Sequence, residues 1–102
     1  MIRLPPVEQT LRLEGRTIGF ETGRGGFQSE RPTMVLIHGA GGSTQAWRGQ
    51  IGPLGRKMNV LALDLPGHGR SDGPALDNLP AAAAWVIEVL EAMAWPGRPL
   101  NA

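Results

Sequence analysis

Cysteine is absent from this chain of 102 residues, and histidine occurs only twice. Without cysteine there can be no disulfide framework, no thiolate zinc site and no thiol nucleophile. No apolar run approaches the roughly 20 residues that a membrane-spanning helix needs, and residues 1–6 lack the apolar stretch of a signal peptide. These absences predict a soluble, cytoplasmic protein without a metal site.

An excess of charge of one sign is lacking as well. The formal net charge is +1, and the basic residues are scattered along the chain. Binding to nucleic acid or to an anionic membrane needs clustered positive charge, so we expect neither as a partner. The length allows one small domain or a piece of a larger one. The 15 glycines and 9 prolines indicate a fold with many turns.

The N-terminal region alternates between apolar and polar residues. The alternation runs over residues 7–21 and is interrupted at Glu14-Gly15, which predicts a β-hairpin that turns there. Residues 23–32 have no periodicity and many residues that disfavour regular structure, so we expect a loop.

Two continuous apolar runs follow, at residues 34–37 and 60–63. Such runs are typical of parallel strands covered on both faces, and the first is therefore expected to be parallel, buried and central. Between them, Ser43 can cap a short helix that ends by Leu54 or Gly55. Its apolar face would carry Trp47, Ile51 and Leu54. The pattern predicts a right-handed strand–helix–strand unit.

The last element is expected to be a helix over residues 79–95, capped by Asp77 or Asn78. One side of it would carry Ala82, Val86, Val89, Leu90 and Met93. The predicted fold class is therefore α/β: an N-terminal hairpin followed by a parallel βαβ unit and a further helix.

Two loops stand at the predicted carboxyl ends of the parallel strands, where α/β proteins bind ligands. His38-Gly39 opens the first, and the second fits the pattern D-x-x-G-x-G-x-S-x-x-P from Asp64 to Pro74. Together they resemble the α/β-hydrolase superfamily. The resemblance covers residues 7–100 and implies a partial α/β-hydrolase sheet. It also implies that residues 1–102 form the N-terminal part of a domain and break off before the expected fifth strand and the nucleophile elbow.

The resemblance assigns a role to the first loop. Backbone N–H groups in a glycine-rich turn can stabilise the oxyanion of an acyl-transfer reaction. By resemblance, Ala40 donates that hydrogen bond and Gly41 allows close approach of a small-molecule substrate. The same glycines could instead only permit a tight turn. The resemblance implies hydrolysis of an ester or related bond by an activated nucleophile. It places the nucleophile, acid and base outside this chain, so we expect the chain alone to be inactive and without a cofactor.

Two alternatives remain open from the sequence. Residues 39–44 nearly fit the dinucleotide-binding pattern G-x-G-x-x-G, with Asp64 as a later acidic residue, but Thr44 stands where the pattern needs Gly or Ala. A non-catalytic, partner-binding chain is the other alternative. Family strand order would leave residues 34–37 at an open sheet edge, which invites pairing with another chain or aggregation.

Several conspicuous residues are predicted to be structural. Gly69-Arg70-Ser71-Asp72-Gly73 fits G-x-S-x-G, but no strand leads directly into it and no helix follows, so Ser71 should order its loop rather than act as a nucleophile. Asp64 should accept backbone N–H bonds, and the two histidines should be hydrogen-bonded at their loops. Solvent exposure is expected for four glutamates: Glu14, Glu21, Glu88 and Glu91.

Overall fold

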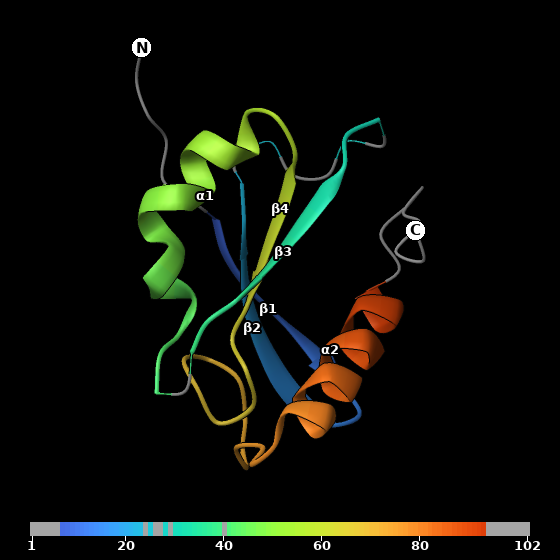
Figure 1. Cartoon of the computed structure of the whole chain (residues 1–102). Coiled ribbons are helices and arrows are strands. Elements are labelled where there is room, and N and C mark those ends of the chain that lie inside the picture. Colours follow the sequence, from blue (N-terminus) through green and yellow to red (C-terminus); the bar gives the residue numbers. More distant parts are fainter. Residues whose placement is uncertain (1–6, 24, 26–27, 29, 40, 94–102) are drawn as a thin grey trace.

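A computed structural model describes residues 7–23, 25, 28, 30–39 and 41–93 (Figure 1). In chain order the elements are β1 (Val7–Leu13), β2 (Arg16–Thr22), β3 (Thr33–Ile37), the 3-10 helix η1 (Thr44–Trp47), α1 (Arg48–Gly55), β4 (Asn59–Leu63) and α2 (Leu79–Met93).

The first two strands form the expected hairpin. Leu13 pairs with Arg16, which leaves Glu14 and Gly15 as a two-residue turn. Both turn residues have positive φ, 51° and 80°. This backbone conformation matches the twist of the flanking strands, and a glycine at the second position tolerates it without strain.

The four strands form one mixed sheet in the order β1-β2-β4-β3. β2 pairs with β4 in the antiparallel direction, whereas β3 and β4 are parallel and are joined through α1. The expected βαβ unit is therefore confirmed, with the hairpin continuing the sheet beside β4.

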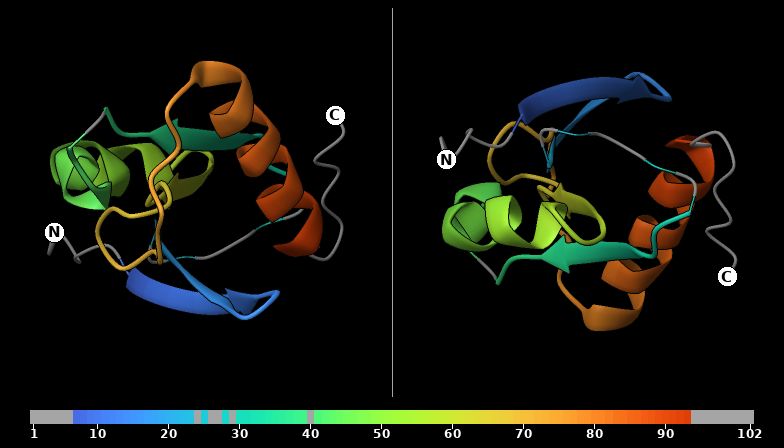
Figure 2. Two further views of the ribbon diagram at one scale, coloured as in Figure 1. Left: turned by 90° about the horizontal axis from the view of Figure 1, so that it is seen from below. Right: turned by 90° about the horizontal axis from the view of Figure 1, so that it is seen from above.

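The two helices cover opposite faces of this sheet (Figure 2). Alternate residues of β4 face each helix: Val60 and Ala62 pack with Ile51 of α1, and Leu61 and Leu63 pack in the cluster that contains Val89 of α2. All five residues of β4 are buried, so this strand is the centre of both cores.

The prediction that residues 34–37 form a buried, central strand is wrong in both respects. β3 is parallel, but it is the outermost strand of the sheet, and Met34 and Ile37 are 37% and 36% exposed. Its apolar sequence suits a strand covered on both faces, but strand order leaves it at the edge. Its edge position agrees with the family strand order, while pairing with another chain stays a prediction.

Helix α2 begins at Leu79, directly after the predicted capping residue Asn78. Asn78 Oδ1 accepts the N–H of Ala81 at 2.8 Å. The predicted apolar side packs on the sheet through Val86, Val89, Leu90 and Met93. The predicted end of the helix, residues 94–95, lies outside the described residues.

Candidate active site

The loops at the carboxyl ends of β3 and β4 contact each other directly. Three hydrogen bonds join them: Leu65 N–H to His38 Nε2 at 3.0 Å, Gly41 N–H to His68 Nε2 at 2.9 Å, and Thr44 N–H to Asp64 Oδ1 at 2.7 Å. Residues 38–43 and 64–74 are the two segments that the sequence singled out. They therefore meet at the carboxyl ends of β3 and β4.

Both histidines use both ring nitrogens to hold backbone. Because each Nε2 accepts an amide N–H, the proton must reside on Nδ1, which donates to Gly39 O from His38 at 2.7 Å and to Pro66 O from His68 at 3.0 Å. The ring centroids are 5.0 Å apart. The prediction that both histidines are hydrogen-bonded at their loops is confirmed.

Asp64 anchors both loops from a buried position. Asp64 is only 1% exposed. Its Oδ2 accepts the N–H of Arg70 at 3.1 Å, and its Oδ1 accepts the N–H of Thr44. Two glycines make room for this carboxylate. A Cβ at Gly19 would lie 2.7 Å from Oδ2, and a Cβ at Gly69, where φ is +52°, would overlap the carboxylate.

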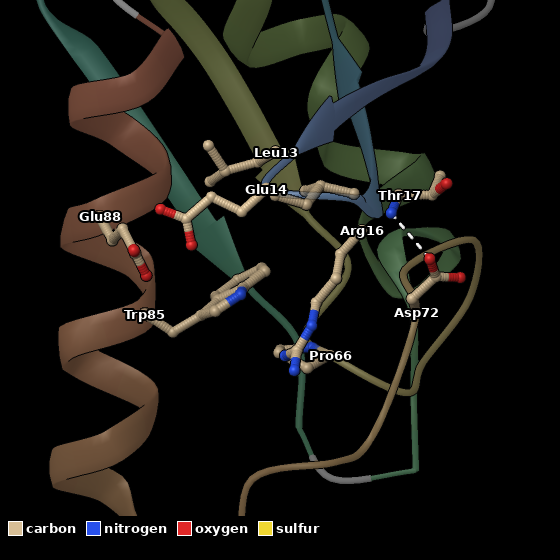
Figure 3. A pocket seen from close by; sticks show the side chains of 9 residues that line it. Leu13, Glu14, Arg16, Thr17, Pro66, Asp72, Trp85 and Glu88 are labelled. Atoms are coloured by element: carbon tan, nitrogen blue, oxygen red, sulfur yellow. Dashed lines mark hydrogen bonds between the residues drawn. The ribbon is translucent and has the colours of Figure 1, made fainter.

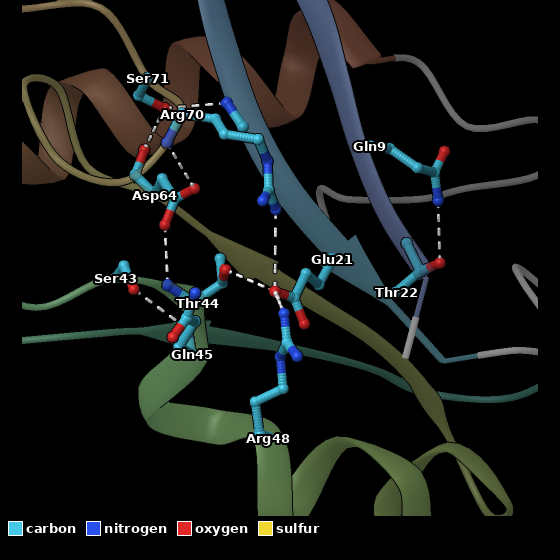
Figure 4. Close-up of polar contacts among 11 residues, drawn as sticks. Gln9, Glu21, Thr22, Ser43, Thr44, Gln45, Arg48, Asp64, Arg70 and Ser71 are labelled. Atoms are coloured by element: carbon cyan, nitrogen blue, oxygen red, sulfur yellow. Dashed lines mark hydrogen bonds and ion pairs between the residues drawn. The ribbon is translucent and has the colours of Figure 1, made fainter. Parts of the chain in front are cut away.

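Ser71 orders its loop, as predicted. Its Oγ donates to the carbonyl oxygen of Asp64 at 2.6 Å and accepts the N–H of Gly19 at 2.9 Å (Figure 4). β4 ends at Leu63 and α2 begins at Leu79, so Ser71 does not lie on a strand-to-helix elbow. Its hydroxyl thus bonds to two backbone groups in a residue only 7% exposed, as expected of a side chain that orders its loop.

The prediction that Glu21 lies on a solvated face is wrong. Glu21 is 0% exposed, whereas Glu14, Glu88 and Glu91 are exposed as expected. Glu21 lies where β2 pairs with β1 on one side and with β4 on the other, and Thr44, Arg48 and Arg70 contact its carboxylate, so this position is buried. The partners of the Glu21 carboxylate come from segments distant in sequence, and no local pattern signals them.

The glycine-rich loop is a tight turn. Gly42 N–H donates to Gly39 O at 3.0 Å, and Gly41 has a φ of +81°, which glycine adopts readily. A Cβ at Gly41 would meet open space, so backbone conformation rather than crowding favours glycine there. Ala40, the expected donor, lies outside the described residues.

A hollow of about 370 Å³ opens between the two loops and the start of α2. It is lined mainly by apolar side chains together with both histidines: Ile37, His38, Gly39, Leu65, Pro66, His68, Leu76, Asp77, Asn78, Leu79 and Ala82. Ile37, the last residue of β3, is part of this lining and is itself 36% exposed.

A second hollow of about 270 Å³ lies between the hairpin turn, loop 64–74 and α2 (Figure 3). Trp85 and Glu88 of α2 border it, and Asp72 Oδ2 accepts the N–H of Thr17 at its rim at 2.8 Å. Polar surface predominates here, and the loop that the sequence connects with chemistry reaches it only through Pro66 and Asp72.

Within the described ranges, the structure brings together no group of three or more His, Cys, Asp or Glu side chains that could hold a metal ion. Of the helices that the structure describes, none combines the length and apolar character needed to cross a membrane.

Two of the curated relatives of this chain are hydrolases. It is 39% identical over 67 residues to an (E)-2-((N-methylformamido)methylene)succinate hydrolase of Acinetobacter baylyi, which covers 65% of this chain and 26% of that protein. It is also 39% identical over 72 residues to a pimeloyl-(acyl-carrier protein) methyl ester esterase of Methylococcus capsulatus, covering 70% and 28%. The chain thus spans about a quarter of the length of each of these two relatives.

Solved structures of other proteins also superpose on most of this chain. A membrane phospholipase A superposes with a TM-score of 0.74 at 30% identity, over 86% of this chain and 28% of that one. A haloalkane dehalogenase of Bradyrhizobium elkanii superposes with a TM-score of 0.72 at 19% identity, over 87% and 29%, and shares the fold. Residues 32–96, which include both loops, match the α/β hydrolase fold family, and the chain belongs to that family.

Proposed function

We propose that the protein carrying these residues hydrolyses an ester or related bond of a small molecule, and that loop 38–43 supplies one half of its oxyanion hole. The observation that carries this proposal is the arrangement of the glycine-rich loop. His68 and Asp64 of loop 64–74 accept hydrogen bonds from its backbone, and it borders an apolar hollow of about 370 Å³. Such fixed backbone donors stabilise developing negative charge without reorganising.

The hydrogen bonds of the loop support Ala40 as its donor. Three other N–H groups of this segment already donate hydrogen bonds: that of Gly41 to His68, that of Gly42 to Gly39 and that of Thr44 to Asp64. They are therefore committed to holding the loop. In this proposal the N–H of Ala40 is the donor, and Gly41, where a Cβ would meet open space, allows close approach of the substrate.

The remaining catalytic groups would come from other parts of the protein. His38, His68, Asp64 and Ser71 all bond to backbone groups, which suits a scaffold rather than a catalytic triad. We therefore propose that residues 1–102 form the N-terminal part of an α/β-hydrolase domain and that this part has no activity alone.

The alternatives have less support. A dinucleotide-binding loop would need amides directed at a pyrophosphate, yet the amides of Gly41 and Thr44 serve the neighbouring loop. The hydrolases among the relatives favour ester or related bonds as the substrate class. A cytoplasmic location and the absence of nucleic-acid and membrane partners stay predictions.

A graft tests the proposal. Residues 7–93 would replace the matching segment of the Methylococcus capsulatus esterase, and hydrolysis of a p-nitrophenyl ester would be measured. Replacing the Ala40 N–H with an ester oxygen by semisynthesis should lower kcat by about 10²–10³ fold, since one oxyanion donor is lost. Ala40→Gly keeps the N–H and should retain most activity. An unchanged kcat in the ester-substituted graft would refute the oxyanion role.

The ungrafted chain is the second test. We expect its turnover of the same ester to equal the buffer background, with or without Ser71→Ala. Turnover that Ser71→Ala abolishes would overturn the scaffold assignment of this serine.

A further inference from the structure

Glu21 is a buried carboxylate that contacts Thr44, the residue directly after the glycine-rich loop. It lies on β2, is 0% exposed, and its Oε2 accepts the hydroxyl of Thr44 at 2.7 Å (Figure 4). We propose that Glu21 is a positioning residue that fixes the oxyanion loop through Thr44. This inference rests on the proposed function of that loop.

Thr44 is held at two points by two carboxylates. Its backbone N–H donates to Asp64 Oδ1 at 2.7 Å, and its side-chain hydroxyl donates to Glu21 Oε2 at the same distance. Thr44 is also the first residue of η1, directly after the loop. Glu21 and Asp64 together therefore fix both the position and the orientation of the residue at which the loop ends.

The charge of Glu21 is balanced from two further segments. Arg48, the first residue of α1, places Nη2 3.3 Å from Oε2, and Arg70 of loop 64–74 places Nη2 3.7 Å from the same oxygen. One oxygen atom thus joins β2, the start of the helical segment and the second loop. A well-packed apolar side chain could stabilise the fold equally well, so the charge is better explained by the arrangement it specifies.

The two carboxylate oxygens are used unequally. Within the described part of the chain, no hydrogen-bond donor reaches Oε1, which is buried. The hydrogen bond that matters for the loop therefore passes through Oε2 alone, and glutamine can reproduce it with its carbonyl oxygen. Misplacement of a catalytic group by about 1 Å can lower turnover about 10²-fold, which is the scale of effect that such positioning protects.

Hydrogen exchange of the 102-residue chain measures the positioning directly. Glu21→Met and Thr44→Val should each accelerate exchange of the Thr44 amide about tenfold or more relative to the amides of β4, because a bond to a charged group is lost. Glu21→Gln should restore much of the protection, and the double variant should exceed neither single variant. Glu91→Gln, an exposed glutamate on α2, is the matched control and should change nothing.

Equal acceleration of the Thr44 and β4 amides, or no acceleration, would overturn the inference, because a merely structural role lowers global stability alone. Thr44→Val and Glu21→Gln provide the same comparison if Glu21→Met does not fold. In the esterase graft, Glu21→Met should lower kcat and leave KM within about twofold. The graft with an ester oxygen in place of the Ala40 N–H is the comparison. If its kcat is low while the kcat of the Glu21→Met graft is normal, the role of Glu21 is refuted and the oxyanion proposal stays intact.

Discussion

The two loops of the candidate site are ordered in different ways. Loop 64–74 is closed largely by its own residues: the Asp64 carboxylate accepts the N–H of Arg70, and Ser71 Oγ donates to the Asp64 carbonyl. Backbone bonds within it, such as Ser71 N–H to His68 O at 2.9 Å, complete the closure.

Loop 38–43 is held mainly from outside. His68 accepts the N–H of Gly41, Asp64 accepts that of Thr44, and Glu21 accepts the Thr44 hydroxyl. The loop that carries the proposed chemistry thus depends on the loop that carries none. Damage to residues 64–74 should therefore spread to residues 38–43. In the reverse direction His38 accepts the N–H of Leu65, so damage at residues 41–43, rather than at His38, should stay local.

The largest effect is expected at Asp64, which serves both loops. In Asp64→Asn one of the two accepting oxygens becomes an amide donor that faces a backbone N–H. We expect the free energy of unfolding to fall by about 3 kcal/mol, measured by urea denaturation with tryptophan fluorescence. Asp72→Asn is the control, because Asp72 is exposed and accepts one N–H, from Thr17. Its loss should be under about 1 kcal/mol, and equal losses would contradict the anchoring role of Asp64.

A glycine with positive φ in each loop gives the next comparison. Gly69→Ala combines an unfavourable φ with overlap on the Asp64 carboxylate, and should cost about 2–3 kcal/mol. Gly41→Ala has the unfavourable φ but open space for its methyl group, and should cost about 1 kcal/mol. If the two costs prove equal in urea denaturation, crowding against Asp64 plays no part.

Two serines extend the comparison to smaller effects. Ser71→Ala leaves the N–H of Gly19 without its acceptor in a buried site, and should cost about 1–2 kcal/mol. Ser43→Ala removes a cap that accepts the N–H of Gln45 at 3.2 Å, and should cost about 0.5 kcal/mol. Thermal unfolding of both variants beside the parent chain would check this order, which a larger loss at Ser43 would reverse.

The features that could be predicted from the sequence depend on local patterns. The turn at Glu14-Gly15 is specified by two adjacent residues, and the strands by alternating or continuous apolar residues. The role of Asp64 as an anchor also follows from its place at a strand end. Spacing alone showed that Ser71 does not lie on an elbow.

The features that could not be predicted depend on distant partners. Glu21 is buried because Arg48 and Arg70 come to it from other elements, and nothing near residue 21 signals them. β3 and β4 share one apolar pattern, yet β4 is fully buried and β3 lies at the edge. A sequence pattern states which surroundings a strand suits, and strand order decides which surroundings it receives.

The most local effect is expected at His68. His68→Phe keeps a planar ring but removes the acceptor of the Gly41 N–H and the donor to Pro66 O, so the free energy of unfolding should fall by about 1 kcal/mol or less. The Gly41 amide proton should shift upfield and exchange faster in NMR spectra, while the Thr44 amide, which Asp64 holds, should keep its parent shift. A matching change at Thr44 would mean that the loop moves as one body. Independence of the two amides would mean that the loop has two separate points of support, so that its proposed donor at Ala40 could be tuned from the His68 side without loss of the fold.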